Sequence, residues 1–349
     1  MKRTEVMIDC EKIKHPNTGL FSFCTQLANS IEKVKDEYKI DTTYLITKKC
    51  LAFLPDGIKY RLLTIIDKIY FRANSKINLF HASFQLGKYI PSDTKVVLTI
   101  HDLNYLYEKS PKKAKKLHAW VQRNIDKADY LVAISEFAKQ DALKHLKTNN
   151  KPFDVIYNGC TFYNGQQIDS PVYKPECKFF FTLGTILPKK NFHVLPALLT
   201  DNNYELIIAG NKSDYCDIII AEAKKFNVEN RVKILGPVSE ADKDWYYRNC
   251  SAFMFPSIAE GFGLPVIEAL HYGKPTFISQ HTSLPEIGKD YCFYFDYDFD
   301  PEKMRVELRN GMDQFNQRDI NLQIEYAHSY SWDNAARKYC EIYNKLISE

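Results

Sequence analysis

The sequence predicts an α/β protein with two domains, each built on a doubly wound parallel sheet. Its 349 residues exceed what a single hydrophobic core usually supports, so two domains are expected. Short apolar runs such as 79–82 and 95–100 alternate with helical patterns, which is typical of parallel sheets. Residues 166–177 hold two prolines and little periodicity, which predicts a linker between the domains.

These observations place a first domain at residues 1–165, the linker at 166–177, a second domain at 178–325 and C-terminal helices at 326–349. A net charge of +4 is too small to indicate nucleic-acid binding by itself. The nine cysteines are odd in number and form no Cys-x-x-Cys pair, which favours reduced thiols in a cytoplasmic protein. We see no signal peptide and no apolar run long enough to span a membrane.

The first domain is predicted to begin with a strand at Val6–Asp9, a turn that ends at Gly19 and a helix over Leu20–Lys33. A second strand follows at Thr43–Thr47. His101 and Asp102 come directly after the strand 95–100, and ligands of parallel sheets bind at such carboxyl ends. A histidine in this position is also often a structural hydrogen-bonding group.

The second half of this domain opens with the densest basic patch, Lys109–Lys116. It is either a solvated helix start or an electrostatic contact with anionic lipid or a phosphorylated acceptor. A helix over Ala119–Lys127, a strand over Tyr130–Ile134 and a helix with Ser135 as its N-cap complete the pattern.

The second domain is predicted to start with a strand at Phe179–Leu183 that ends in the turn Gly184–Asn191. A strand ending at Gly210, a helix capped by Ser239, a strand over Pro275–Ser279 and a loop over Thr282–Gly288 follow. Residues 326–347 read as a final helical region.

The stretch Ser257–His271 is the centre of the prediction. It follows the apolar run 252–256 and reads as strand, glycine loop and helix start, with Gly261 and Gly263 in the loop and a proline in the first turn. Backbone N–H groups at such a helix start suit an anion, most often a phosphate. The carboxylates of Glu260 and Glu268 flank it, so a ligand that is anionic at one end and rich in hydroxyls at the other is expected. The alternative is an ordinary strand–loop–helix with both carboxylates solvated.

Glu260 and Glu268, seven residues apart around Gly-Phe-Gly-Leu-Pro, resemble the Glu-x7-Glu signature of the family 4 glycosyltransferases. The segments 99–103, 135–139 and 154–159 are also similar to this family. Ser-Leu-Pro-Glu-Ile-Gly at 283–288 resembles members that build bacterial surface polysaccharides, many of which use GDP-mannose. The resemblance implies the GT-B fold, with two Rossmann-like domains facing across a cleft and a C-terminal tail that crosses back to the first domain.

The resemblance also implies roles for individual residues. The catalytic set would be Glu260, His101 and Lys190, and the acceptor would meet Asp102 and Thr18. Lys189 stands where the family usually has arginine, which keeps the charge but loses the bidentate fork. The donor would contact Gly19, Gly184, Lys189, Lys190, Gly210, Asn211, Glu260, Gly261, Phe262, Gly263, Leu264 and Glu268.

The implied reaction is a retaining transfer of a sugar from a nucleotide diphosphate donor, with GDP-mannose as the first choice, to a saccharide or lipid-linked oligosaccharide. This reaction would serve bacterial surface polysaccharide or lipopolysaccharide synthesis, in the cytoplasm and peripherally on the inner face of its membrane. We expect no metal and no further cofactor, because Lys189, Lys190 and the helix start near Leu264 would stabilise the leaving diphosphate. The alternatives are another GT-B enzyme, such as a UDP-sugar transferase, an epimerase or a phosphorylase, and a non-catalytic GT-B binding subunit.

Overall fold

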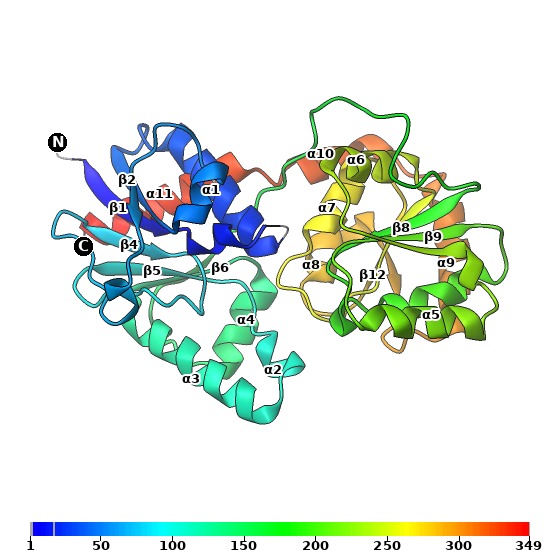
Figure 1. Ribbon diagram of the computed structural model, residues 1–349, viewed down its shortest axis with the longest axis horizontal. Coiled ribbons are helices and arrows are strands. Elements are labelled where there is room, and N and C mark those ends of the chain that lie inside the picture. The colour runs from blue at the N-terminus through cyan, green and yellow to red at the C-terminus, as the bar shows by residue number, and fades with distance from the viewer. Residues whose placement is uncertain (1–2, 17, 349) are drawn as a thin grey trace. The chain divides into compact units, whose positions relative to one another are not determined.

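The computed structural model describes residues 3–16 and 18–348 (Figure 1). They form two compact units, Met1–Thr161 with Tyr330–Glu349, and Phe162–Ser329. Each unit is a parallel sheet covered by helices on both faces, so the predicted fold class is confirmed. No helix among the described residues is both long and apolar enough to cross a membrane.

The sheet of the first unit has seven parallel strands in the order β3-β2-β1-β4-β5-β6-β7. Because the order runs outward from β1 on one side and from β4 on the other, the carboxyl ends of β1 and β4 flank the switch point where such sheets bind ligands. The strands are β1 Thr4–Asp9, β2 Ile40–Ile46, β3 Tyr60–Leu62, β4 Leu79–Ala82, β5 Lys95–Ile100, β6 Tyr130–Ala133 and β7 Phe153–Val155.

Helices cover both faces of this sheet (Figure 1). Phe80 and Leu98 face the side of α3, whereas the next residues, His81 and Thr99, face the side of α11, because successive side chains alternate across a strand. The helices are α1 Gly19–Val34, α2 Tyr105–Glu108, α3 Pro111–Lys127, α4 Glu136–His145 and α11 Trp332–Ser348, with 3-10 turns η1 Glu11–Lys14, η2 Lys48–Phe53 and η3 Ile66–Lys68.

A buried polar chain fastens α11 to the first sheet. Thr99 Oγ1 lies 2.8 Å from His81 Nε2 and 3.0 Å from the Tyr339 hydroxyl, and the Tyr343 hydroxyl lies 2.7 Å from His81 Nδ1. Burial lowers the pKa of His81 to about 3, so its ring is neutral near pH 7. The C-terminal helix is therefore a built-in part of the first unit.

The second sheet has six parallel strands in the order β10-β9-β8-β11-β12-β13, with its switch point between β8 and β11. The strands are β8 Phe179–Leu183, β9 Glu205–Ala209, β10 Val232–Gly236, β11 Ala252–Phe255, β12 Thr276–Ser279 and β13 Phe293–Phe295. The helices are α5 Tyr215–Lys225, α6 Glu240–Asn249, α7 Leu264–His271, α8 Leu284–Gly288, α9 Pro301–Phe315 and α10 Ile320–His328, with 3-10 turns η4 Pro188–Lys190, η5 Phe192–Leu199, η6 Glu229–Arg231 and η7 Lys289–Tyr291.

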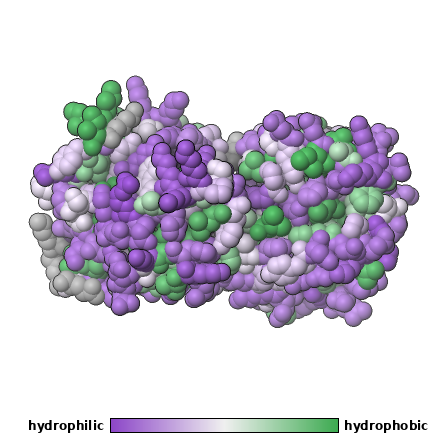
Figure 2. Space-filling view, turned by 90° about the horizontal axis from the view of Figure 1, so that it is seen from below, coloured by the Kyte–Doolittle hydropathy of each residue, from purple (hydrophilic) through white to green (hydrophobic). Residues whose placement is uncertain are grey.

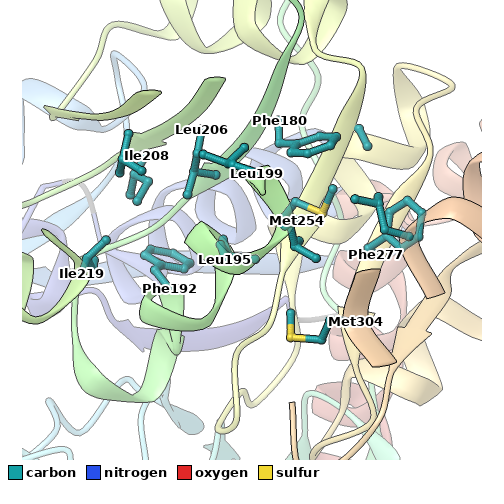
Figure 3. Close-up of a cluster of buried hydrophobic side chains, with 14 of the residues drawn as sticks. Phe180, Phe192, Leu195, Leu199, Leu206, Ile208, Ile219, Met254, Phe277 and Met304 are labelled. Carbon is teal, nitrogen blue, oxygen red and sulfur yellow. The ribbon is translucent and has the colours of Figure 1, made fainter. Parts of the chain in front are cut away.

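One apolar core of the second unit lies under η5, α5 and α9. Figure 3 shows strand residues such as Phe180 and Met254 packed against Phe192 of η5 and Met304 of α9. On the opposite face, Phe181 stacks on Tyr246 of α6, with ring centroids 5.3 Å apart. The side chains of Ser135 and Ser239 cap α4 and α6 as predicted.

Two segments differ from the expected picture. The predicted loop over 282–288 contains the short helix α8, because Pro285 occupies an early helical position where its missing N–H costs nothing. Residues 166–177 are irregular but bonded to the second unit: the Tyr173 hydroxyl donates to Glu205 Oε2 at 2.6 Å, and the Val172 N–H donates to Asp242 Oδ1 at 2.8 Å.

Candidate functional site

The glycine loop after β11 ends at Gly263, which is the N-cap of α7. Its φ is +113°, and a Cβ at this position would lie 2.8 Å from Leu284 Cδ2 of α8. A residue with a side chain is therefore strained here and would push the end of the Leu284 side chain aside. The loop follows β11, one of the two strands that flank the switch point of this sheet, as expected for a ligand site.

Glu260 in this loop is paired with Lys190, although the two residues lie far apart in the sequence. Lys190 Nζ donates to Glu260 Oε1 at 2.5 Å, and the Ser257 hydroxyl donates to the same oxygen at 2.7 Å. Lys190 Nζ also lies 4.7 Å from the centroid of the Phe255 ring. Both charged side chains are mostly buried, so their attraction is screened less than on the surface.

The protonation of Glu260 follows from these neighbours. Burial raises the pKa of Glu260, but the charges of Lys190 and Lys189 outweigh burial and hold the pKa below its ordinary value. Glu260 is therefore a carboxylate near pH 7 that accepts hydrogen bonds. An ammonium has three N–H donors, so Lys190 keeps donors for an anion beyond the one given to Glu260.

A second loop braces the first, and the sequence did not indicate this role. The Glu260 N–H donates to Thr282 Oγ1 at 3.0 Å. The Ser283 hydroxyl is fully buried and lies 3.1 Å from the Glu260 carbonyl and 2.8 Å from the Phe262 carbonyl. Phe262 is itself buried.

Gly184 and Gly210 bring two turns of the second unit together. Both have positive φ, +148° and +134°, and a Cβ on Gly210 would lie 2.0 Å from the Gly184 carbonyl oxygen. A Cβ on Gly184 would lie 3.1 Å from Lys190 Cε, so the glycine leaves room for the lysine that reaches Glu260. The Ile258 N–H donates to the Lys189 carbonyl at 2.9 Å, which ties η4 to the glycine loop.

Glu268, on the second turn of α7, is held by two residues of α6. Lys243 Nζ lies 3.2 Å from Glu268 Oε1, and the Tyr247 hydroxyl donates to Glu268 Oε2 at 2.8 Å. Burial lowers the pKa of Lys243, but the charges of Glu268 and Glu240 more than offset this, and the pKa stands above its ordinary value. The sequence did not single out Lys243 or Tyr247, because nothing in their local pattern shows that α6 lies beside α7.

Three further residues that were predicted to contact the donor substrate are Gly261, Leu264 and Asn211. Gly261 is buried in the loop, and Leu264 is the first residue of α7 and half-buried. The carbonyl of Asn211 accepts from the Ile186 N–H at 2.8 Å, while the side chain of Asn211 is half-buried. The second unit thus brings Gly184, Lys190, Glu260 and Gly263 together. Glu268 lies on α7, the helix that begins directly after Gly263.

His101 in the first unit is buried at the carboxyl end of β5, with 7% of its surface exposed. Its Nε2 donates to the Ser83 carbonyl at 2.8 Å, and its backbone N–H donates to Gln85 Oε1 at 3.0 Å. Because a carbonyl only accepts, Nε2 carries the proton, and Nδ1 is an acceptor that has no hydrogen-bond partner among the described residues. Burial lowers the pKa of His101 to about 4, so the ring is neutral near pH 7.

The other first-unit candidates make local hydrogen bonds. The Thr18 hydroxyl caps α1 by accepting from the Phe21 N–H at 3.2 Å, and Asp102 Oδ1 accepts from the Asn104 N–H at 3.0 Å. A Cβ on Gly19 would meet no atom within 4 Å, so the space at the start of α1 is open. These residues and His101 belong to the first unit.

The described residues contain no group of three or more histidine, cysteine, aspartate or glutamate side chains that could hold a metal ion. The run 296–300 does have Asp-x-Asp spacing. Lys303 Nζ lies 3.1 Å from both Asp296 Oδ2 and Asp298 Oδ2, and Asp300 caps α9. These carboxylates therefore pair with a lysine and cap a helix.

Two family models match the chain: Glycosyltransferase Family 4 over residues 43–161 and Glycosyl transferases group 1 over residues 166–304. The chain is 25% identical to O-antigen chain mannosyltransferase B of Escherichia coli, over 98% of this chain and 100% of that protein. It is 27% identical to the serotype-specific mannosyltransferase WbdA of the same species, over 74% of this chain but 35% of that longer protein.

Solved structures with the same fold include sucrose-phosphate synthase from Thermosynechococcus elongatus, with a TM-score of 0.75, 15% identity and coverage of 99% of this chain and 100% of that one. Anabaena HepE in complex with UDP and glucose matches with a TM-score of 0.71, 15% identity and coverage of 97% and 99%. At these identities the likeness shows the fold alone.

Proposed function

Because the chain belongs to the group 1, family 4 glycosyltransferases with the GT-B fold, we propose that it is a retaining hexosyltransferase that uses GDP-mannose. Enzymes of this family use a nucleotide-sugar donor, typically without a metal cofactor. The acceptor is a saccharide or a lipid-linked oligosaccharide of a bacterial surface polysaccharide. The mannosyltransferases among the relatives support the choice of sugar.

The observation that carries the proposal is the pair that Lys190 of η4 forms with Glu260 of the glycine loop at the second switch point. In our assignment the donor diphosphate approaches the backbone at Gly184 and Gly263 and the ammonium groups of Lys189 and Lys190. As the nucleoside diphosphate leaves, its growing negative charge is stabilised by these fixed groups, an effect of about 2–4 kcal/mol for one preorganised donor. Glu260 accepts from hydroxyls of the transferred sugar, and Glu268 accepts from the ribose.

The first unit is assigned to the acceptor side and the second to the donor side. His101 is neutral, and its Nδ1 is fit to accept a proton from a sugar hydroxyl in a hydrogen bond. Its low pKa argues against a general acid, so we assign it a binding and orienting role. The acceptor proton then passes to an oxygen of the leaving phosphate, as in the front-face mechanism that the family resemblance implies.

We also propose that the enzyme acts in the cytoplasm at an anionic membrane surface, since a lipid-linked acceptor would be found there. The basic start of α3, with Lys112, Lys113, Lys115 and Lys116 exposed, supports this partner.

The test is a thermal-shift screen of the whole protein against GDP, UDP and ADP and their sugar conjugates, each with and without EDTA. Ligand at about 100 times its Kd stabilises the fold by about 2.7 kcal/mol, which is readily measured as a rise in Tm. We expect GDP and GDP-mannose to raise Tm equally with and without EDTA. A shift with UDP-sugars alone would replace the proposed donor.

A screen without any shift would instead favour a non-catalytic binding subunit. Transfer of radiolabelled mannose to a lipid extract measures turnover separately from donor binding, with the double variant Lys190→Met, Glu260→Gln as the control of low activity.

A further inference from the structure

The segment 62–70, here called the isoleucine turn, leaves the edge of the first sheet after β3 and carries three isoleucines outward. Ile65, Ile66 and Ile69 are 78%, 73% and 87% exposed. These are the largest exposed fractions among the large hydrophobic side chains that the structure describes. Leu62 and Tyr70 at the two ends of the segment are exposed as well.

The turn is held in this form by a buried acid. Asp67 Oδ2 accepts from the N–H and the hydroxyl of Thr64 at 2.8 and 2.7 Å, and Asp67 Oδ1 accepts from Arg61 at 2.5 Å. The Ile69 and Tyr70 N–H groups both donate to the Ile66 carbonyl, which closes one helical turn. The polar residue of this segment thus faces inward and the isoleucines face outward, the reverse of an ordinary surface turn.

Exposed aliphatic side chains of this number require an explanation. A single exposed apolar residue is common, but a contiguous group marks a surface that contacts another body. The three isoleucines take no part in the apolar core under α3 in the first unit. Figure 2 shows hydrophobic residues that project in this way from a largely hydrophilic surface.

The charge around the turn indicates which body it contacts. Residues 48–76 contain seven basic and two acidic side chains, and the net charge is +3 once Glu5 and Asp93, which pair with Lys59 and Arg72, are included. One of the two acids, Asp67, is buried. The basic residues are Lys48, Lys49, Lys59, Arg61, Lys68, Arg72 and Lys76.

We propose that the isoleucine turn inserts into the headgroup region of an anionic lipid bilayer, with lysines of residues 48–76 on the lipid phosphates. Apolar residues buried to about 5–10 Å together with nearby basic residues are the mark of interfacial membrane binding. A second copy of the chain fits less well, because a symmetric contact would place one positively charged surface against another. The inference rests on the membrane part of the proposed function alone and assigns it a site other than the basic start of α3.

The experiment is co-flotation of the whole protein, without donor, with vesicles of phosphatidylcholine and with vesicles that also contain phosphatidylglycerol. We expect binding to the anionic vesicles only. The triple variant Ile65→Ser, Ile66→Ser, Ile69→Ser should lower the bound fraction by about tenfold or more, since each isoleucine loses its apolar contact. Its Tm and its Tm shift with GDP should match wild type, which shows that loss of vesicle binding is not loss of fold or of the donor site.

Matched controls make the result specific. The variant Ile218→Ser, Val306→Ser, Leu322→Ser removes three other exposed aliphatic side chains and should float like wild type. The variant Arg72→Glu, Lys76→Glu should weaken binding in a salt-dependent way. The proposal is overturned if the isoleucine variant floats like wild type, or if Lys112→Glu, Lys113→Glu abolishes flotation while the isoleucine variant does not. A wild-type dimer without lipid that the isoleucine variant converts to monomer would assign the turn to a second copy instead.

Discussion

The two units share one architecture but build their switch points differently. In the second unit, Gly184, Gly210 and Gly263 have positive φ and pack against other groups, and a buried ion pair lies beside them. In the first unit, Gly19 borders open space, and the buried His101 at the end of β5 is neutral. The difference teaches that one switch point suits a close-lying anion and the other suits neutral hydroxyls.

The largest expected effect comes from breaking the ion pair of the second unit. Under the proposed function, Lys190→Ala should lower kcat by about 10²–10³, because the cation assigned to the leaving diphosphate is lost. It should also destabilise the fold by about 3–5 kcal/mol, because Glu260 is left buried without its partner. Steady-state kinetics and urea unfolding measure the two effects.

The double variant Lys190→Met, Glu260→Gln separates these effects. It removes both charges, so it should recover most of the stability while activity stays low. Recovery of activity together with stability would mean that the pair is structural only.

The glycines give the next largest contrast. Gly210→Ala should destabilise the protein by about 1–3 kcal/mol or more, because its Cβ would overlap the Gly184 carbonyl. Gly19→Ala has room and should stabilise the protein by about 0.4–1 kcal/mol through the unfolded chain. If the two variants had equal free energies of unfolding, the difference in packing around Gly210 and Gly19 would have no effect on stability, and the comparison of the two units would fail.

The neutral histidine makes the first unit sensitive to acid. The pKa of His101 is about 4 in the folded state and 6.5 as the ordinary value, so the unfolded state binds more protons between these two pH values. Stability from this group is complete above pH 6.5 and is lost as the pH falls toward 4, by about 2 kcal/mol at pH 5. His101→Gln should reduce the slope of the unfolding free energy against pH between pH 4 and 6.5, while the contribution of the buried His81 remains. An unchanged slope would contradict the buried neutral ring of His101.

The smallest expected effect comes from removing the hydrogen bond between Tyr247 and Glu268. Tyr247→Phe removes one hydrogen bond and should weaken nucleotide binding by about 3- to 10-fold with little change in kcat. If Glu268 binds the ribose, the variant should also lose part of its preference for GDP over 2′-deoxy-GDP, measured by calorimetry. A weaker affinity with an unchanged preference would assign Tyr247 a purely structural role.

The sequence was a sufficient guide wherever the information is local. Apolar runs placed most of the strands, but not the short strands β3 and β13. The spacing of Glu260 and Glu268 around the glycines indicated the loop, because this signal lies within one stretch of chain. The helix α8 was missed because Pro285 and Gly288 read as turn residues, although proline is well tolerated early in a helix.

What the sequence could not predict depends on contacts between distant segments. The pairing of Lys190 with Glu260, the hold of Lys243 and Tyr247 on Glu268, and the brace from Ser283 each join elements that only the folded sheet brings together. The tautomer of His101 likewise depends on the Ser83 carbonyl at the end of the neighbouring strand.

The buried hydrogen bonds that join His81, Thr99 and Tyr339 have a consequence for how the protein is made and folded. The strands of the first unit leave the ribosome early, but the helix α11 that covers one of their faces is made after the whole second unit. The first-made unit is therefore completed last, and until then its sheet exposes a partly apolar face to the folding machinery of the cell. A stop codon just before Trp332 should for this reason harm the N-terminal half of the protein while the second unit still folds.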